Sequence, residues 1–194
     1  MANYGSGLSG LGKVWEEGVT VHRVGSDRKK GMTATEALEM LLKSYNRYYN
    51  IKTEDVTSPF AAEAAFHTHD EQYFLVKSAT LSEADAHEYV FFAAGQEMEL
   101  ENVKELDEKA WAEGLSRVTP HANHRSSDIV LIIFAERLSQ DAKDYIKAIK
   151  RYKSYRFTLQ GWSNYSVIAM ETSTGELSCN KRGRDLKKLF RNIK

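Results

Sequence analysis

The chain has 194 residues, of which 42% are hydrophobic and 28% charged, with 27 basic and 27 acidic side chains. This composition excludes a disordered chain, the length suits one domain, and no apolar run approaches the roughly 18 residues of a membrane span. Cys179 is the single cysteine, which excludes an internal disulfide and a cysteine-cluster zinc site. The first ten residues lack a signal-peptide pattern, so we expect a cytoplasmic protein that makes no membrane contact.

The first 32 residues hold seven of the twelve glycines. Because glycine loses much backbone entropy on ordering, we expect residues 1–32 to form a glycine-rich appendage, with a short hairpin over 14–24. We expect residues 33–194 to form a single α+β domain.

The first predicted helix begins at Thr33, where Thr33 and Glu36 fit a capping box, and apolar residues at helical spacing carry it to about Tyr49. Later, a continuous apolar run over 128–135 is typical of a central strand that is buried on both faces. The other predicted elements are strands over 60–67, 72–78 and 87–93, a helix over 101–115, a helix capped by Ser139, strands over 155–159, 165–171 and 177–180, and a helix from about Arg184. The order α-β-β-β-α-β-α-β-β-(β)-α predicts one mixed sheet flanked by helices, and the short spacing of the first three strands favours an antiparallel meander.

The charges are segregated along the chain. Residues 33–120 carry 7 basic and 17 acidic side chains, whereas residues 121–194 carry 15 and 7. Basic and aromatic residues are interleaved over 150–157, a combination that can bind phosphates and stack on bases, and a second basic cluster spans 181–191. The candidate anion-binding residues are Lys150, Arg151, Lys153, Arg156, Lys181, Arg182, Arg184, Lys187, Lys188 and Arg191. The alternative is that these residues have no binding role. The acidic region 33–120 and the basic region 121–194 then neutralise each other within one chain or across a homodimer, while Tyr155 and Phe157 point inward.

Four histidines are candidate metal ligands. His67 and His69 lie two residues apart near a predicted strand end, so their side chains share a face, and His121 and His124 in a polar loop could complete the site. The simpler interpretation is that all four are turn and surface residues, because no complete metal-ligand signature is present.

Three stretches carry a family resemblance: PHANHRSSDIVLII (120–133), KSYRFTLQGWSNYSVIAMET (153–172) and NKRGRDLKK (180–188). They resemble an uncharacterised bacterial family of unknown function over about residues 33–193, and the resemblance implies no activity. The element order is also similar to the α-β-β-β-α-β core of restriction-endonuclease-like folds, whose enzymes need an Asp/Glu-x-Lys pair. Glu88 on the third strand has no lysine two positions later, so a nuclease of this kind is disfavoured.

We therefore expect a non-catalytic binding or regulatory domain, with an anionic ligand or nucleic acid on its basic C-terminal third and no cofactor. A homo-oligomer is compatible with this expectation. The alternative is a metal-dependent or hydrolase-like enzyme that uses the histidine cluster, and the sequence leaves the choice open.

Overall fold

The computed structural model describes residues 31–45, 49–67, 85–191 and 193. The predicted N-terminal hairpin, the predicted strand over 72–78 and His69 lie outside these ranges. In the part of the chain that is described, no helix is long and apolar enough to cross a membrane.

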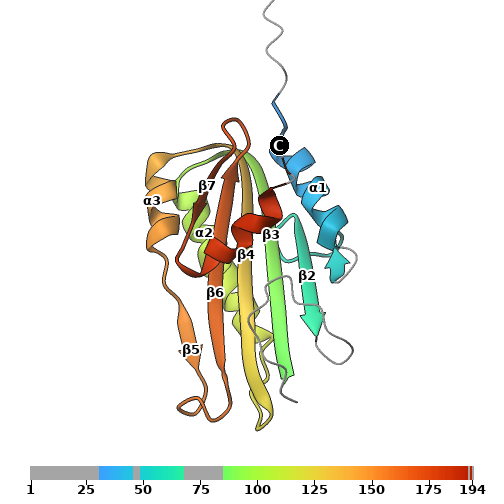
Figure 1. Ribbon diagram of the computed structural model, residues 1–194, viewed down its shortest axis with the longest axis vertical. Coiled ribbons are helices and arrows are strands. Elements are labelled where there is room, and N and C mark those ends of the chain that lie inside the picture. The colour runs from blue at the N-terminus through green and yellow to red at the C-terminus, as the bar shows by residue number, and fades with distance from the viewer. Residues whose placement is uncertain (1–30, 46–48, 68–84, 192, 194) are drawn as a thin grey trace, which may run out of the picture. The chain divides into compact units, whose positions relative to one another are not determined.

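Seven strands of the described chain form one mixed sheet in the order β1-β2-β3-β4-β6-β5, and β7 also pairs with β6 (Figure 1). β1, β2 and β3 are antiparallel neighbours, whereas β3, β4 and β6 run parallel. The elements are α1 (Ala34–Tyr45), β1 (Asn50–Lys52), β2 (Ala62–His67), β3 (Asp85–Met98), α2 (Leu100–Ser116), β4 (His124–Leu138), α3 (Gln140–Ala148), β5 (Tyr152–Ser154), β6 (Trp162–Glu171), β7 (Glu176–Cys179) and the 3-10 helix η1 (Arg182–Phe190). The predicted α+β class with a single mixed sheet is confirmed.

β4 is the central strand, and its apolar run is buried on both faces as predicted. The odd-numbered residues from Ile129 to Ala135 pack with α2 and α3, and the even-numbered residues from Val130 to Phe134 pack with α1 and η1. Figure 1 shows these helices on the two sides of the sheet. Because successive strand residues point to opposite faces, this alternation assigns a face to the residues of the parallel strands that follow the register shift between Asp85 and Ala86.

Two predicted helix starts are confirmed by their hydrogen bonds. The Glu36 backbone N–H donates to Thr33 Oγ1 over 3.2 Å, and the Thr33 N–H donates to Glu36 Oε2 over 2.8 Å, which is a capping box. Ser139 Oγ accepts from the Ala142 N–H at 3.3 Å and caps α3.

Several predicted boundaries are wrong. The predicted strand over 155–159 is a turn, because the Tyr155 N–H donates to the Gly161 carbonyl and closes the chain on itself; β5 lies earlier, at Tyr152–Ser154. β1 was not predicted, and the last predicted helix is a 3-10 helix. β4 begins at His124, so polar residues that were predicted to lie in a loop stand on a strand.

The outer edge of β6 is covered in two pieces. β5 pairs with Trp162–Asn164 and β7 pairs with Ile168–Glu171. Between them Asn180, only 2% exposed, takes the place of a strand: its Oδ1 accepts from the Val167 N–H (3.1 Å) and its Nδ2 donates to the Tyr165 carbonyl (3.1 Å). The same Oδ1 accepts from the Gly183 N–H at 2.8 Å and so fixes the start of η1.

Candidate functional site

Polar side chains gather where the parallel strands β3, β4 and β6 begin. His87, Ser127 and Ser163 are register partners on the face that carries α2 and α3. The next residues along, Glu88, Asp128 and Asn164, are register partners on the opposite face. At the end of the sheet where these strands begin, there are therefore two different rows of polar side chains, one on each face.

His124 organises the first row. Its ring is buried, with Nδ1 2.8 Å from the Gln160 carbonyl oxygen and Nε2 2.9 Å from Ser127 Oγ. Because a carbonyl only accepts, Nδ1 must carry the proton, which leaves Nε2 of the neutral ring to accept from the Ser127 hydroxyl. The arrangement polarises Ser127, yet the Ser127 side chain is completely buried.

Further aromatic side chains surround this pair. The His124 ring centroid lies 6.2 Å from that of His87, 6.0 Å from that of His121 and 5.8 Å from that of Tyr155. The Tyr155 hydroxyl lies 2.8 Å from Ser163 Oγ. The result is a compact network of imidazoles and hydroxyls under the turn that follows β5.

The structure places two of the four histidines predicted as metal ligands next to each other. His121 and His124 come together, but both nitrogens of His124 are already occupied by protein partners. His67 is the register partner of His87. The side chain of His67 and the whole of His69 are not among the parts of the chain that the structure describes. Among the described residues, no group of three or more His, Cys, Asp or Glu side chains has an arrangement that could hold a metal ion.

Sequence reasoning left His87 out of this cluster. The alternation of β3 places His87 on the same face as Tyr89 and Phe91, but only the pairing of β3 with β4 brings it beside Ser127. That pairing joins residues 40 positions apart and has no local signal in the sequence.

The second row contains two carboxylates. The Tyr49 hydroxyl donates to Glu88 Oε2 over 2.7 Å, and Asn164 Nδ2 donates to Asp128 Oδ1 over 2.8 Å. Burial raises the pKa of the Glu88 carboxyl, the Tyr49 hydrogen bond lowers it and the nearby charge of Asp128 raises it, and together they bring it to about 7. Asp128, the middle residue of this row, is exposed.

The turn over 155–161 has an unusual backbone. Arg156, Phe157 and Thr158 have φ values of 44°, 54° and 73°, three successive non-glycine residues in the left-handed region. Phe157 is 96% exposed and Leu159 is 79% exposed. Gly161, with φ of 77°, lies so close to β4 that an added Cβ would sit 2.4 Å from the Arg125 carbonyl oxygen.

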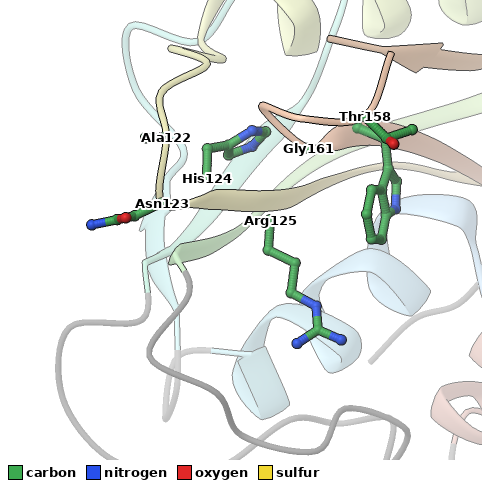
Figure 2. Close-up of a pocket in the computed structure, with 7 residues that line it drawn as sticks. Ala122, Asn123, His124, Arg125, Thr158 and Gly161 are labelled. Carbon is green, nitrogen blue, oxygen red and sulfur yellow. The ribbon is translucent and has the colours of Figure 1, made fainter. Parts of the chain in front are cut away.

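A shallow pocket of about 330 Å³ lies between this turn and the start of β4 (Figure 2). Figure 2 shows His124 and Arg125, which both line the pocket, projecting to opposite sides of β4. It is lined by Ala122, Asn123, His124, Arg125, Thr158, Gly161 and Trp162.

The predicted anion-binding residues form two groups. Arg151 is engaged within the fold, since its guanidinium lies 2.6 Å from Oδ2 of the buried Asp107 on α2. The other residues of the first group, Lys150, Lys153 and Arg156, are exposed around β5 and its turn. The second group is exposed along η1 and comprises Lys181, Arg182, Arg184, Lys187, Lys188 and Arg191. No ion pair joins these nine exposed cations to another described residue.

The comparisons with known proteins give a family and no activity. The chain belongs to the family of the domain of unknown function DUF8052, whose model matches residues 33–192. No curated protein and no solved structure matches the chain.

Proposed function

We propose that this member of the DUF8052 family is a non-catalytic binding domain that holds an anionic partner along β5 and the turn after it. We call this region the β5 surface, and it consists of Lys150, Tyr152, Lys153, Arg156, Phe157 and Leu159. The observation that carries the proposal is the exposure of Phe157, 96%, on a turn with three successive left-handed residues.

The backbone of this turn is unfavourable on its own. A non-glycine residue in the left-handed region costs roughly 1–2 kcal/mol, and such conformations persist where the surroundings impose them. Here the Gln160 carbonyl is held by His124, and Gly161 packs against β4. The buried histidine network thus holds a strained turn that presents a phenylalanine to solvent, an arrangement that core packing does not require.

The chemistry of the β5 surface favours single-stranded nucleic acid as the class of partner. Lys153 and Arg156 supply cations for phosphates, and Tyr152, 55% exposed, and Phe157 supply rings on which unpaired bases can stack. Stacking contributes roughly 1–3 kcal/mol per base and tolerates any sequence. The proposal therefore expects a salt-dependent interaction with little sequence preference.

Fluorescence anisotropy with a labelled single-stranded RNA, measured over a range of salt concentrations, tests the proposal. The double variant Lys153→Glu/Arg156→Glu should weaken binding by at least about tenfold and reduce the salt slope, because each phosphate contact contributes roughly 0.7 units for a single strand. Phe157→Ala should weaken binding without changing the slope, since it removes stacking alone.

Two controls make the result specific. Lys52→Glu on β1 reverses an exposed lysine at the other border of the sheet and should leave binding unchanged. Lys187→Glu/Lys188→Glu reports on η1, the second predicted basic cluster. If the RNA does not bind, or if Lys52→Glu weakens binding as much as the β5 variants do, the proposal is wrong.

A second candidate function, a hydrolase, is favoured by one observation: the Ser127 hydroxyl lies 2.9 Å from His124 Nε2 while the Gln160 carbonyl orients the ring. Reaction with a substrate would require the turn to open, because Ser127 is buried. A fluorophosphonate probe should then label the protein and fail to label Ser127→Ala. Absence of labelling in the wild-type protein would dismiss this candidate.

A further inference from the structure

We propose that a hydrated divalent cation of the Mg²⁺ class binds at the start of the parallel strands, held by oxygen atoms of Glu88, Asp128 and Asn164. This site lies on the face of the sheet that carries α1 and η1, opposite the histidine network. The inference does not depend on the proposed partner of the β5 surface.

The strand register brings the three residues together. Glu88 pairs with Asp128, and Asp128 pairs with Asn164, across the adjacent parallel strands β3, β4 and β6. Neighbouring strands lie roughly 4.8 Å apart, and register partners point to the same face. The three side chains therefore share one face, with Asp128 between the other two, and the effect of the Asp128 charge on the Glu88 carboxyl reflects the proximity of these two groups.

Asn164 adds a buried amide oxygen to the two acidic residues. It is 7% exposed, and its Oδ1 is a buried acceptor to which no described residue donates a hydrogen bond. Its Nδ2 donates to Asp128 Oδ1, so flipping the amide would place an oxygen against a carboxylate. A buried acceptor without a donor is destabilising by roughly 1–3 kcal/mol, and a cation beside the two carboxylates would satisfy it.

Each carboxylate also has one oxygen fixed by a neighbour and one left for a ligand. Tyr49 donates to Glu88 Oε2, and Asn164 donates to Asp128 Oδ1, while Glu88 Oε1 and Asp128 Oδ2 accept from no described residue. Hydrogen bonds of this kind orient metal ligands in proteins. Asp128 is exposed, which gives an ion a route from solvent.

The ligand set indicates the class of cation. Two carboxylate oxygens and one amide oxygen are hard ligands, which suit Mg²⁺, Mn²⁺ and Ca²⁺ rather than softer metals. Mg²⁺ keeps several waters and typically binds through one or two carboxylates, whereas Ca²⁺ takes roughly six to eight oxygens. Three protein oxygens with water in the other positions fit Mg²⁺, and Mn²⁺ can replace it as a spectroscopic probe.

Mn²⁺ binding to the full chain, followed by electron paramagnetic resonance and by calorimetry, tests the site. We expect one Mn²⁺ per chain, displaced by Mg²⁺, and a rise in the melting temperature when either metal is added. Asp128→Asn, at an exposed position that does not threaten the fold, should weaken binding by at least about tenfold. Glu88→Gln should do the same while it keeps the Tyr49 hydrogen bond.

The matched control is Asp141→Asn, an exposed aspartate in the first turn of α3. It removes the same charge and should leave Mn²⁺ binding unchanged. Circular dichroism of each variant checks that the fold is intact. The proposal fails if the wild-type chain binds no Mn²⁺ at concentrations up to about 10 mM, or if Asp128→Asn and Asp141→Asn bind it as the wild-type chain does.

Discussion

Replacing Asn180 with alanine tests the account of the β6 edge. The side chain fills the gap between β5 and β7, where it accepts from the Val167 and Gly183 N–H groups and donates to the Tyr165 carbonyl. Alanine would leave the Val167 and Gly183 N–H groups, both buried, without an acceptor, and each is then destabilising by roughly 1–3 kcal/mol. The Tyr165 carbonyl would also lose the hydrogen bond that Asn180 donates. The free energy of unfolding should therefore fall by about 2–6 kcal/mol, because water has no access to a side chain that is 2% exposed.

Urea denaturation followed by tryptophan fluorescence measures this change, with the slope m compared between variants to confirm the same unfolding transition. Asn102→Ala is the matched control: its side chain also bonds to backbone, accepting from the Glu99 N–H in the capping box of α2, but at an exposed position. Its loss should lower stability by about 1 kcal/mol. A loss below about 1 kcal/mol for Asn180→Ala would refute the idea that this side chain replaces a strand.

Three other perturbations have defined outcomes. Ile132→Ala, at a completely buried position of β4, should destabilise the fold by about 2–5 kcal/mol in the same urea assay, and a loss under about 1 kcal/mol would contradict a doubly buried strand. Gly161→Ala should lower the melting temperature and weaken RNA binding together, because the new Cβ would clash with the β4 backbone at a φ of 77°; an unchanged melting temperature would argue against the close approach. Glu88→Gln should remove a pH dependence of stability, because folding raises the pKa of Glu88 from 4.5 to about 7. Relative to this variant, the free energy of unfolding of the wild-type chain should fall by on the order of 3 kcal/mol as pH rises from 4.5 to 7 in metal-free buffer. Parallel curves of unfolding free energy against pH for the two proteins would show that the pKa of Glu88 is not raised.

The fold was largely predictable because the hydrophobic pattern of the sequence indicates which segments are buried. The continuous apolar run over 128–135 predicts a strand buried on both faces, and this segment lies in β4, the central strand. The caps at Thr33 and Ser139 are local, so the sequence alone located the two helix starts. The turn after β5 was missed because Tyr155 and Phe157 alternate like strand residues. Its left-handed backbone is held by hydrogen bonds within the turn and by the contact of the Gln160 carbonyl with His124, which lies 36 positions away in the chain.

The candidate site was only partly predictable for a similar reason. The basic residues could be found from composition, but Arg151 lies against Asp107, a pairing that depends on how α2 packs beside β5. The carboxylate row was not predicted, because Glu88, Asp128 and Asn164 come from three strands joined by crossovers. Each residue looks ordinary in its own segment, and only the register between strands makes them neighbours.

The short strands at the sheet borders have a consequence for aggregation. Strands that leave long rows of unpaired backbone groups can recruit another chain and start an amyloid-like stack. In the described chain, β1 and β5 have three residues each and β7 has four, while Asn180 occupies the backbone groups between β5 and β7. An incoming strand would find no continuous ladder along β6 to extend. In the described part of the chain, the β6 side of the sheet therefore offers little edge for growth into fibrils.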